Sequence, residues 1–471
     1  MCFPIVFATY LVHLFVSGYD RFYFDADNYW DLGKQFRNHG HFSLVSYDGV
    51  FRGYSVPLLN HVLQALASGF GVGSVTIVKV FGALLAATLG VVVAPRLARA
   101  LFSGAEIGPA RVLALNGVLF LYWRDHFDFP LSDFPSLLVA ALGVLALLRA
   151  TPWGFLAAGV CLGVAVNARP AYLPALAVGI LAAALQARRA DWTRRGVAAG
   201  LVVAGALVAS FPQMLINHHQ RGTWSPQIPR QKEIARIQLS VGMRAQKYET
   251  YVGPRSGYPR PEVFYLDPST QHVLKEDHVP PRFDPVLGQR VDITSYGQYV
   301  GIVVRHPFAM AAAYARHLFN GVDVQYPTPY VRDLGDRSTL LSLLQYTLLF
   351  AAVVRLLLPG ARRSLGRIRW WGFGVLASAC LTSIPGPVEP RFFLPLQLLV
   401  YFLVCFGPKT RAFLLGDTLD RRITLAASYG AFLLVCLIAS SATRAQLEYR
   451  ISSTSAGTPA AALGAPHLPP R

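Results

Sequence analysis

The sequence has few charged residues for its length. Only 14% of the 471 residues are Asp, Glu, Lys or Arg, and 53% are hydrophobic, whereas an ordinary soluble domain carries about 25% charged residues. A soluble chain of this length could not cover its surface with so few charges. The composition therefore excludes a soluble enzyme, a disordered chain and a compact nucleic-acid binder, and it predicts a polytopic membrane protein.

Acidic residues and cysteines are both scarce. Lys and Arg number 43 against 25 Asp and Glu, a net charge of +18, which in a membrane protein indicates cytoplasmic anchoring loops and not a nucleic-acid surface. None of the five cysteines lies in the long polar segment 216–336. The sequence therefore predicts no disulfide framework and no CxxC metal site.

Apolar segments recur along most of the chain, and each is near the ~20 residues that a spanning helix needs. The first, Phe3–Gly18, has no basic region before it and no cleavage site after it, so we interpret it as a retained helix and not a signal peptide. With it, eleven spanning helices are predicted, the others centred on 75–95, 109–123, 131–150, 153–168, 170–187, 196–215, 338–358, 370–384, 391–407 and 423–440. The predicted fold class is thus an all-α polytopic membrane protein.

The distribution of charge predicts the orientation. With eleven crossings, the loops on one side hold 17 basic and four acidic residues, so this side is expected to be cytoplasmic, with the N-terminus, in a plasma (inner) membrane. The shorter apolar segment Val56–Gly71 is interpreted as a helix lying on the membrane. The alternative, a twelfth crossing, would invert everything after it and contradict the charge bias.

These spans divide the chain into four parts. Residues 1–215 form an N-terminal transmembrane module that contains the first outer loop, 19–74. Residues 216–336 form a long outer segment, too rich in aromatic residues to be disordered, with a further interfacial helix at 298–319. Residues 337–440 are the C-terminal helices, and the tail 441–471 is predicted to be disordered.

The first outer loop contains the most informative acidic cluster. Asp25, Asp27 and Asp31 lie among aromatic residues directly after the first helix. A carboxylate that is partly shielded there would have a raised pKa and could take a proton from a hydroxyl group, which makes Asp25 and Asp27 the catalytic candidates. The alternative is that Asp25 or Asp27 caps a helix.

Further candidates for substrate binding lie at other outer loops. Asp133 begins the fourth span, where an acid usually faces a cavity or a partner, although Ser132 or Asp133 could also cap that helix. Arg169 could hold a phosphate, snorkel or pair with one of the acids. His218 adjoins His219, but neighbours on a helix point in different directions, so no zinc site is predicted. The remaining candidates are Arg52, Arg124, Glu389 and Arg391.

The order of these features resembles the GT-C glycosyltransferases, especially the branch with protein O-mannosyltransferases and bacterial aminoarabinose transferases. The features are the acidic motif Phe24–Asp25–Ala26–Asp27, an interfacial helix, the basic stretch Pro95–Phe102, an Asp-bearing loop before the fourth helix, a long outer loop after the seventh, and Glu389–Pro390–Arg391 at the start of a late helix. The resemblance covers most of the chain as an ordered layout. Ala26 departs from it, because relatives often carry a second acid there.

The resemblance implies an inverting transfer of a sugar from a polyprenyl-phosphate carrier to a lipid, glycan or protein acceptor on the outer face. It implies that Asp25 is the base, with Asp27 in reserve, that Asp133 has a structural or acceptor role, and that Arg391 lies near the carrier phosphate. Neither a cofactor nor a nucleic-acid partner is expected. The alternatives are a transporter or flippase of lipid-linked sugars, a polymerase or ligase of whole glycans, and a membrane scaffold without activity.

Overall fold

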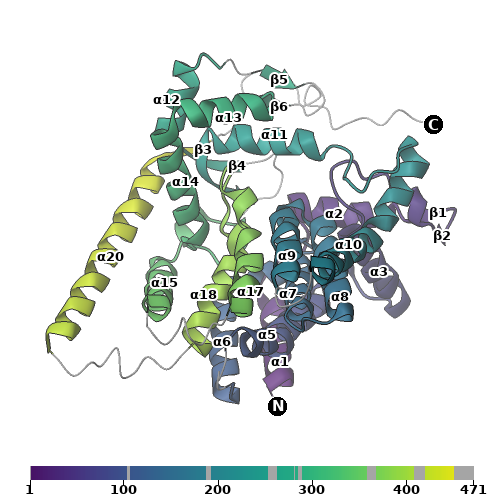
Figure 1. Ribbon diagram of the computed structural model, residues 1–471, viewed down its shortest axis with the longest axis horizontal. Helices are drawn as coiled ribbons and strands as arrows, with labels where there is room; N and C mark the ends of the chain where they lie inside the picture. The colour runs from purple at the N-terminus through teal and green to yellow at the C-terminus, as the bar shows by residue number, and fades with distance from the viewer. Residues whose placement is uncertain are drawn as a thin grey trace.

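The computed structural model is mostly helical (Figure 1). It describes residues 2–102, 107–186, 192–252, 262–279, 282–284, 289–357, 367–407 and 419–449. The predicted disorder of residues 450–471 and several of the basic residues used to predict the orientation lie outside these ranges.

Each of the eleven predicted spans coincides with a helix. These helices are α1 (Cys2–Val16), α4 (Ser74–Ala87) continued by η2 (Thr88–Val93) and α5 (Ala94–Leu101), α6 (Pro109–Trp123), α7 (Asp133–Leu147), α8 (Pro152–Ala168), α9 (Leu173–Gln186), α10 (Trp192–Arg221), α15 (Thr339–Leu357), α17 (Arg367–Ser378), α18 (Leu394–Phe406) and α20 (Leu419–Ala445).

Four helices in the described residues are long and apolar enough to cross a membrane. They are Ser74–Leu101, Trp192–Arg221, Thr339–Leu357 and, within α20, Arg422–Ala445. The chain therefore has the helices of a membrane protein. The other seven predicted spans are helices shorter than 18 residues, so the number of eleven crossings stays a prediction.

One hydrophobic core joins the apolar helices from α1 to α18. Small residues bring these helices close together, as at Gly159, whose Cα faces the Val202 backbone of α10. The π-helical stretch η2 lies between α4 and α5, where Gly90 meets Asn116 of α6. The Asn116 side-chain amide donates to the Gly90 carbonyl at 3.1 Å. In contrast, α20 stands apart at the edge of the bundle (Figure 1), and only 11% of its apolar window is buried.

The first outer loop folds into two helices packed on each other. They are α2 (Phe24–Lys34) and α3 (Ser55–Phe70), with β1 (Arg37–Asn38), β2 (His41–Phe42) and η1 (Leu44–Ser46) between them. The polar residues of α3 bind the backbone of α2: Asn60 donates to the Tyr29 carbonyl at 3.0 Å and Gln64 to that of Trp30 at 2.6 Å. The predicted short helix at Val56–Gly71 is therefore present.

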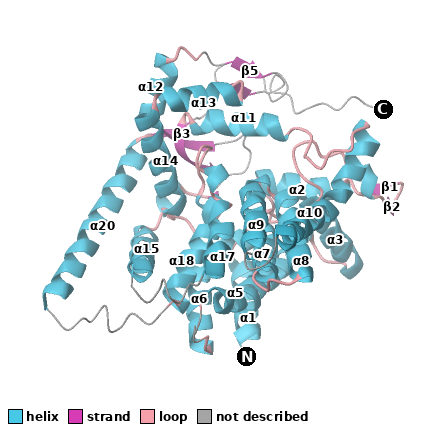
Figure 2. Ribbon diagram, in the orientation of Figure 1, coloured by secondary structure: helices cyan, strands magenta, loops and turns pink. Residues whose placement is uncertain are grey.

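The outer segment 216–336 is folded, as its aromatic content indicated, but it is not all helical. Its elements are α11 (Gln231–Gly242), β3 (Ala245–Tyr251), β4 (Glu262–Leu266), α12 (Pro268–Glu276), β5 (Arg282–Asp284), β6 (Gln289–Val291), α13 (Tyr296–Arg305), α14 (Pro307–Val322), β7 (Tyr330–Val331) and η5 (Leu334–Asp336). The all-α prediction missed these strands, which lie above the helical bundle in Figure 2. The helix expected at 298–319 is divided into α13 and α14, because Pro307 cannot donate to a continuing helix.

The predicted disordered tail begins too early. Helix α20 extends to Ala445, and β8 (Leu447–Tyr449) pairs antiparallel with β4. Since β8 completes a four-stranded sheet in the order β7-β3-β4-β8, the end of the described chain, 447–449, folds together with the outer segment 216–336. The hydrogen bonds of the sheet order these residues despite their polar composition.

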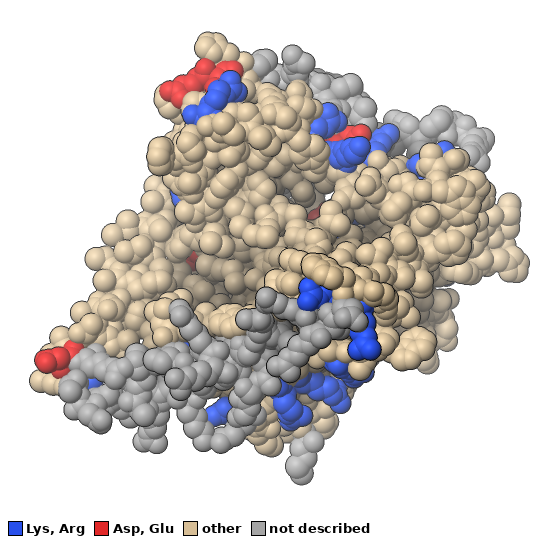
Figure 3. All heavy atoms as spheres, viewed as in Figure 1, with Lys and Arg blue, Asp and Glu red and all other residues tan. Residues whose placement is uncertain are grey.

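Charged side chains gather at the two ends of the molecule. In Figure 3 Lys and Arg prevail at the lower end, where the N-terminus lies in Figure 1, and the upper end carries both signs. The described Arg residues at helix ends include Arg96, Arg99 and Arg149, all exposed. The broad middle of this face shows few charged atoms, as expected for a surface in contact with the apolar interior of a membrane.

Candidate functional site

Asp25 lies in the first turn of α2, at the end of a strained backbone. Phe24 has a φ of +42°, a conformation that an aromatic residue rarely adopts. The amide of Ala26, the residue after Asp25, donates to the Tyr330 hydroxyl at 3.0 Å. The N-cap position is held by Tyr23 without a side-chain hydrogen bond. The alternative that Asp25 or Asp27 caps this helix is therefore wrong.

Two arginines from distant segments meet the Asp25 carboxylate. Nη2 of Arg52 lies 2.9 Å from Oδ1, and Nη2 of Arg391 lies 3.4 Å from Oδ2. The Arg52 guanidinium also stacks over the Tyr29 ring, 4.9 Å from its centre. Since 38% of the Asp25 side chain and 33% of that of Arg52 remain exposed, this pair forms the open edge of the site.

Arg391 connects Asp25 to a buried set of charges. Its guanidinium pairs with Glu389 (3.2 Å from Nη2 to Oε1) and approaches Asp133 Oδ2 at 3.7 Å. Asp133 in turn pairs with Arg169, whose guanidinium lies over the Phe392 ring. The N-cap of α7 is Ser132, again without a side-chain cap, so Asp133 serves the ion pairs and does not cap the helix.

Six of the nine predicted site residues thus form one network of three carboxylates and three guanidiniums. They come from four places: α2, the loop before α3, the facing ends of α7 and α8, and η7 (Pro390–Phe393) at the start of α18. Short 3-10 turns, η3 (Arg124–Asp128), η4 (Pro170–Tyr172) and η6 (Leu381–Ser383), connect the helices near this level. These helix ends bring residues far apart in the sequence together.

The electrostatics correct one expectation. Partial burial would raise the pKa of Asp25, but the nearby Arg52 and Arg391 outweigh it, so that the pKa lies below its usual value. The expectation of a raised pKa is therefore wrong for Asp25, because the sequence did not show that two cations would lie against it. Burial, opposed by Arg391, does raise the pKa of Glu389.

Three predicted residues lie elsewhere. Asp27 is largely exposed on α2 and pairs with none of the site residues. Partial shielding from water and repulsion from Asp31 raise its pKa. Arg124 donates to the Leu121 carbonyl at 3.0 Å and approaches Asp125 at 3.9 Å. His218 stacks on Trp224 with ring centres 4.3 Å apart. The side chains of Arg124 and His218 contact local partners and not the network.

A pocket adjoins the network at Arg391 and Glu389. Arg391 and Glu389 line one wall, and the remainder includes Trp123, Tyr248 and Gln397. Trp123 is fixed by a hydrogen bond from its ring nitrogen to Gln397 at 2.9 Å. His126 also lines this pocket; burial and repulsion from Arg391 lower its pKa to about 4, so the ring is neutral at pH 7.

The sequence did not single out the residues that the outer domain adds to this pocket. Tyr248 and Glu249 of β3 line it, and Lys247 pairs with Glu249 at 3.0 Å. A signal was present: Lys247 and Glu249 are two residues apart, and in a strand such residues share one face. In the part of the chain that the structure describes, no three His, Cys, Asp or Glu side chains lie together as metal ligands.

Comparisons of this chain with protein-family models, with curated proteins and with solved structures found no significant match.

Proposed function

We propose that the chain is a membrane glycosyltransferase that moves a sugar from a polyprenyl-phosphate carrier to an acceptor on the outer face. The observation that carries this proposal is the meeting of Asp25 with Arg52 and Arg391 beside an aromatic pocket. A carboxylate and guanidiniums are groups that such a transfer needs: a base and cations for a phosphate. The layout that resembles the GT-C class supports it too.

In the proposed reaction, the acceptor hydroxyl oxygen attacks the anomeric carbon of the sugar from the side opposite the phosphate. The bond from that carbon to the phosphate oxygen breaks, its electron pair stays on the phosphate, and the configuration inverts. Asp25 takes the hydroxyl proton. Arg52, which is partly exposed, turns from Asp25 to the donor phosphate, and the loss of this partner raises the proton affinity of Asp25 when a base is needed.

The deeper residues hold the geometry. Arg391 is 6% exposed and is fixed by Glu389 and Asp133, so it faces Asp25 as a fixed positive charge. Arg169 neutralises Asp133, so this carboxylate attracts Arg391 less strongly than Glu389 does. The outer position of this site, eleven crossings and a cytoplasmic N-terminus complete the proposal. A transfer assay with lipid, glycan and protein acceptors identifies the acceptor class.

The experiment is a transfer assay with purified protein and carriers that bear a single hexose or pentose, joined to mass spectrometry of lipid-linked sugars in a deletion strain. We expect transfer in the assay and accumulation of one lipid-linked sugar in the strain. Movement of the carrier across vesicles without any transfer would favour a flippase. Transfer of oligosaccharide carriers alone would favour a polymerase or ligase. Absence of both transfer and accumulation would contradict the proposal.

A further inference from the structure

The turn 384–391 carries both Glu389 and Arg391, and its backbone has no regular secondary structure before η7 begins at Pro390. The positions of these two side chains therefore depend on the contacts that hold the turn from other segments. Three of these contacts come from the outer segment 216–336, which is distant in the sequence.

Two of the three contacts involve backbone atoms on both sides. The Tyr248 amide of β3 donates to the Val388 carbonyl at 2.9 Å. At the end of α11, Gly242 lies so close to the turn that an added methyl group would come within 2.3 Å of the Pro385 carbonyl oxygen. This distance is well below that of two atoms in van der Waals contact. β3 and α11 therefore both contact the turn directly.

The third contact is made by a side chain, that of His317 on α14. The residue is 1% exposed, and its Nδ1 lies 2.5 Å from the Ile384 carbonyl oxygen. Because a carbonyl oxygen can only accept, Nδ1 must carry the hydrogen and donate it. Burial lowers the pKa of His317, so the ring is neutral at pH 7. A buried carbonyl that loses its donor is costly, so this bond holds the start of the turn.

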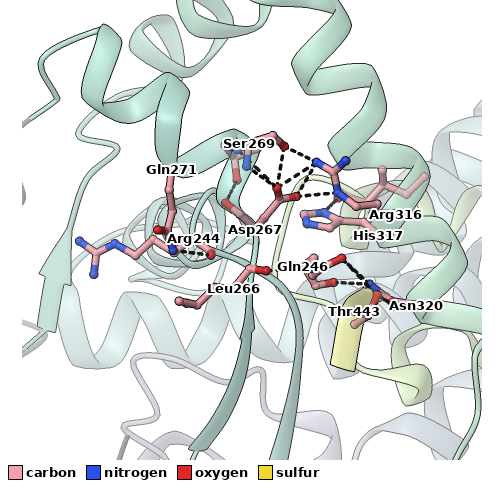
Figure 4. Close-up of polar contacts among 12 residues, drawn as sticks. Arg244, Gln246, Leu266, Asp267, Ser269, Gln271, Arg316, His317, Asn320 and Thr443 are labelled. Atoms are coloured by element: carbon pink, nitrogen blue, oxygen red, sulfur yellow. Dashed lines mark hydrogen bonds and ion pairs between the residues drawn. The ribbon is translucent and has the colours of Figure 1, made fainter. Parts of the chain in front are cut away.

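Figure 4 shows how α14 is held on both sides of His317 along the helix. One residue before it, Arg316 pairs with the buried Asp267 at the start of α12, with 2.8 Å between Nη2 and Oδ2. Three residues after it, Asn320 donates to the Gln246 carbonyl of β3 at 3.2 Å. These contacts fix the rotation of α14 about its axis, and they thereby fix the direction of the His317 ring.

The contact between Arg391 and Asp25 is the one most sensitive to the position of this turn. Glu389 belongs to the same turn, so its ion pair with Arg391 would move with it. Asp25 lies on α2 instead, and its Oδ2 is 3.4 Å from Nη2 of Arg391, near the limit of a hydrogen bond. A displacement of the turn by about 1 Å is therefore enough to lose this contact.

We propose that His317 is a positioning residue for the proposed transfer: its bond to the Ile384 carbonyl sets the turn 384–391 so that Arg391 reaches Asp25. This inference rests on the proposed function. The outer segment is then part of the frame of the site and not only a surface for an acceptor. If His317 merely stabilised the outer segment, its loss would lower the melting temperature without changing the ionisation of Asp25.

The first test is the pH dependence of transfer by purified full-length protein, with citronellyl-phosphate carriers that bear one hexose or pentose. His317→Asn keeps a side-chain N–H near the position of Nδ1, whereas His317→Gln places its N–H near the position of Nε2, away from Ile384. Arg391 opposes the effect of burial on the pKa of Asp25. Its displacement by His317→Gln should therefore move the acidic limb of the kcat/KM profile upward by at least about half a pH unit. His317→Asn should keep the profile of the unaltered protein.

Both variants leave the other titratable groups in place. Those near Asp25 are Arg52, Arg169, Glu389, Tyr248 and Tyr330, and those near His317 are Arg316 and Asp267. A shift of the profile therefore reports the position of Arg391 relative to Asp25.

The second test needs no transfer. Melting temperatures in detergent are measured for the unaltered protein, Asp25→Asn, His317→Gln and the double variant. Two sites that share no partner give additive changes. If His317 places Arg391 on Asp25, the change caused by Asp25→Asn should be at least about halved in the His317→Gln background. His317→Asn is the matched control, and in its background the change should keep its full size.

Additive melting temperatures would overturn the inference, as would an unshifted pH profile in an active His317→Gln protein or equal shifts for the two amide variants. If His317→Gln does not fold, Gly242→Ala displaces the same turn through Pro385, and an unshifted profile in that variant would contradict the role of the turn. Coupled melting temperatures without transfer by any protein would leave the positioning standing and remove the proposed function. Transfer with additive melting temperatures would leave the proposed function standing and remove the positioning.

Discussion

Nη2 of Arg391 lies 3.4 Å from Oδ2 of Asp25, although 366 residues separate the two in the sequence. Asp25 follows the first helix of the chain, and Arg391 lies in η7, directly before α18. Their contact joins the N-terminal and C-terminal helices at one site. The proposed chemistry therefore depends on the complete bundle, and no part of the chain contains the site by itself.

The replacement Asp25→Asn tests the proposed base. The amide keeps the shape of the carboxylate but cannot accept the acceptor proton, so we expect transfer to fall by about 10²–10⁴-fold with unchanged membrane insertion. The matched control is Asp27→Asn, two residues along the same helix, whose exposed side chain pairs with none of the site residues. Full transfer activity in Asp25→Asn would remove Asp25 from the mechanism, whatever the control shows.

The lowered pKa of Asp25 predicts how stability depends on pH. Because Arg52 and Arg391 lower the pKa in the folded protein, the ionised carboxylate stabilises the fold above its unfolded pKa of about 3.9, and this contribution is lost as the pH falls through the lower folded value. The difference in melting temperature between the unaltered protein and Asp25→Asn should thus stay constant from about pH 8 to pH 5 and change only below about pH 4. A change centred near pH 6 would show that the pKa of Asp25 is raised.

The sequence predicted the helices and most of the site, for different physical reasons. Apolar runs reveal helices because their length and composition are local properties, and the charged residues at their outer ends gave Asp25, Asp133, Arg169 and Arg391. The lowered pKa of Asp25 could not be predicted, because it depends on two cations that the fold brings from afar. The Lys247–Glu249 ion pair was missed because a spacing of two residues identifies a shared face only once a strand is predicted, and the long outer segment has no strong strand pattern.

Arg391→Met should reduce the stability of the protein. Arg391 is 6% exposed and faces Glu389, Asp133 and Asp25. Its removal leaves the buried Glu389 carboxylate without a cation, which typically costs about 3–5 kcal/mol. The measurement is thermal unfolding in detergent by the fluorescence of the tryptophans. Arg124→Met is the control, since Arg124 makes only a local backbone hydrogen bond and a long contact with Asp125. Equal melting temperatures for the two variants would show that Arg391 is dispensable for the fold.

The orientation in the membrane can be measured with reporters. The charge bias predicts that fusions near Asp191 and at Arg149, between α7 and α8, report the cytoplasmic side. Fusions near Gly222, at the end of α10, and within 262–266, in the outer sheet, should report the opposite side. An extracytoplasmic signal near Asp191 would invert the whole arrangement and turn Asp25 toward the cytoplasm, where the proposed donor and acceptor do not meet.

Gly53→Ala tests whether the backbone beside Arg52 positions its guanidinium. A methyl group at Gly53 would collide with the backbone oxygen of Asn167, and the segment cannot easily yield, because Asn167 also accepts from the Ser55 amide at 3.0 Å and the Tyr47 hydroxyl donates to the Arg52 carbonyl at 2.9 Å. We expect Arg52 to move from Asp25, transfer to fall at least tenfold, and stability to fall by about 1–3 kcal/mol. Gly69→Ala is the matched control: no side chain or backbone of another segment lies within 4 Å of its added methyl group, and alanine favours the helix α3 by about 1 kcal/mol. If the two variants transfer sugar equally well, the close approach of Gly53 to Asn167 does not position Arg52, and Arg52 finds Asp25 by its own flexibility.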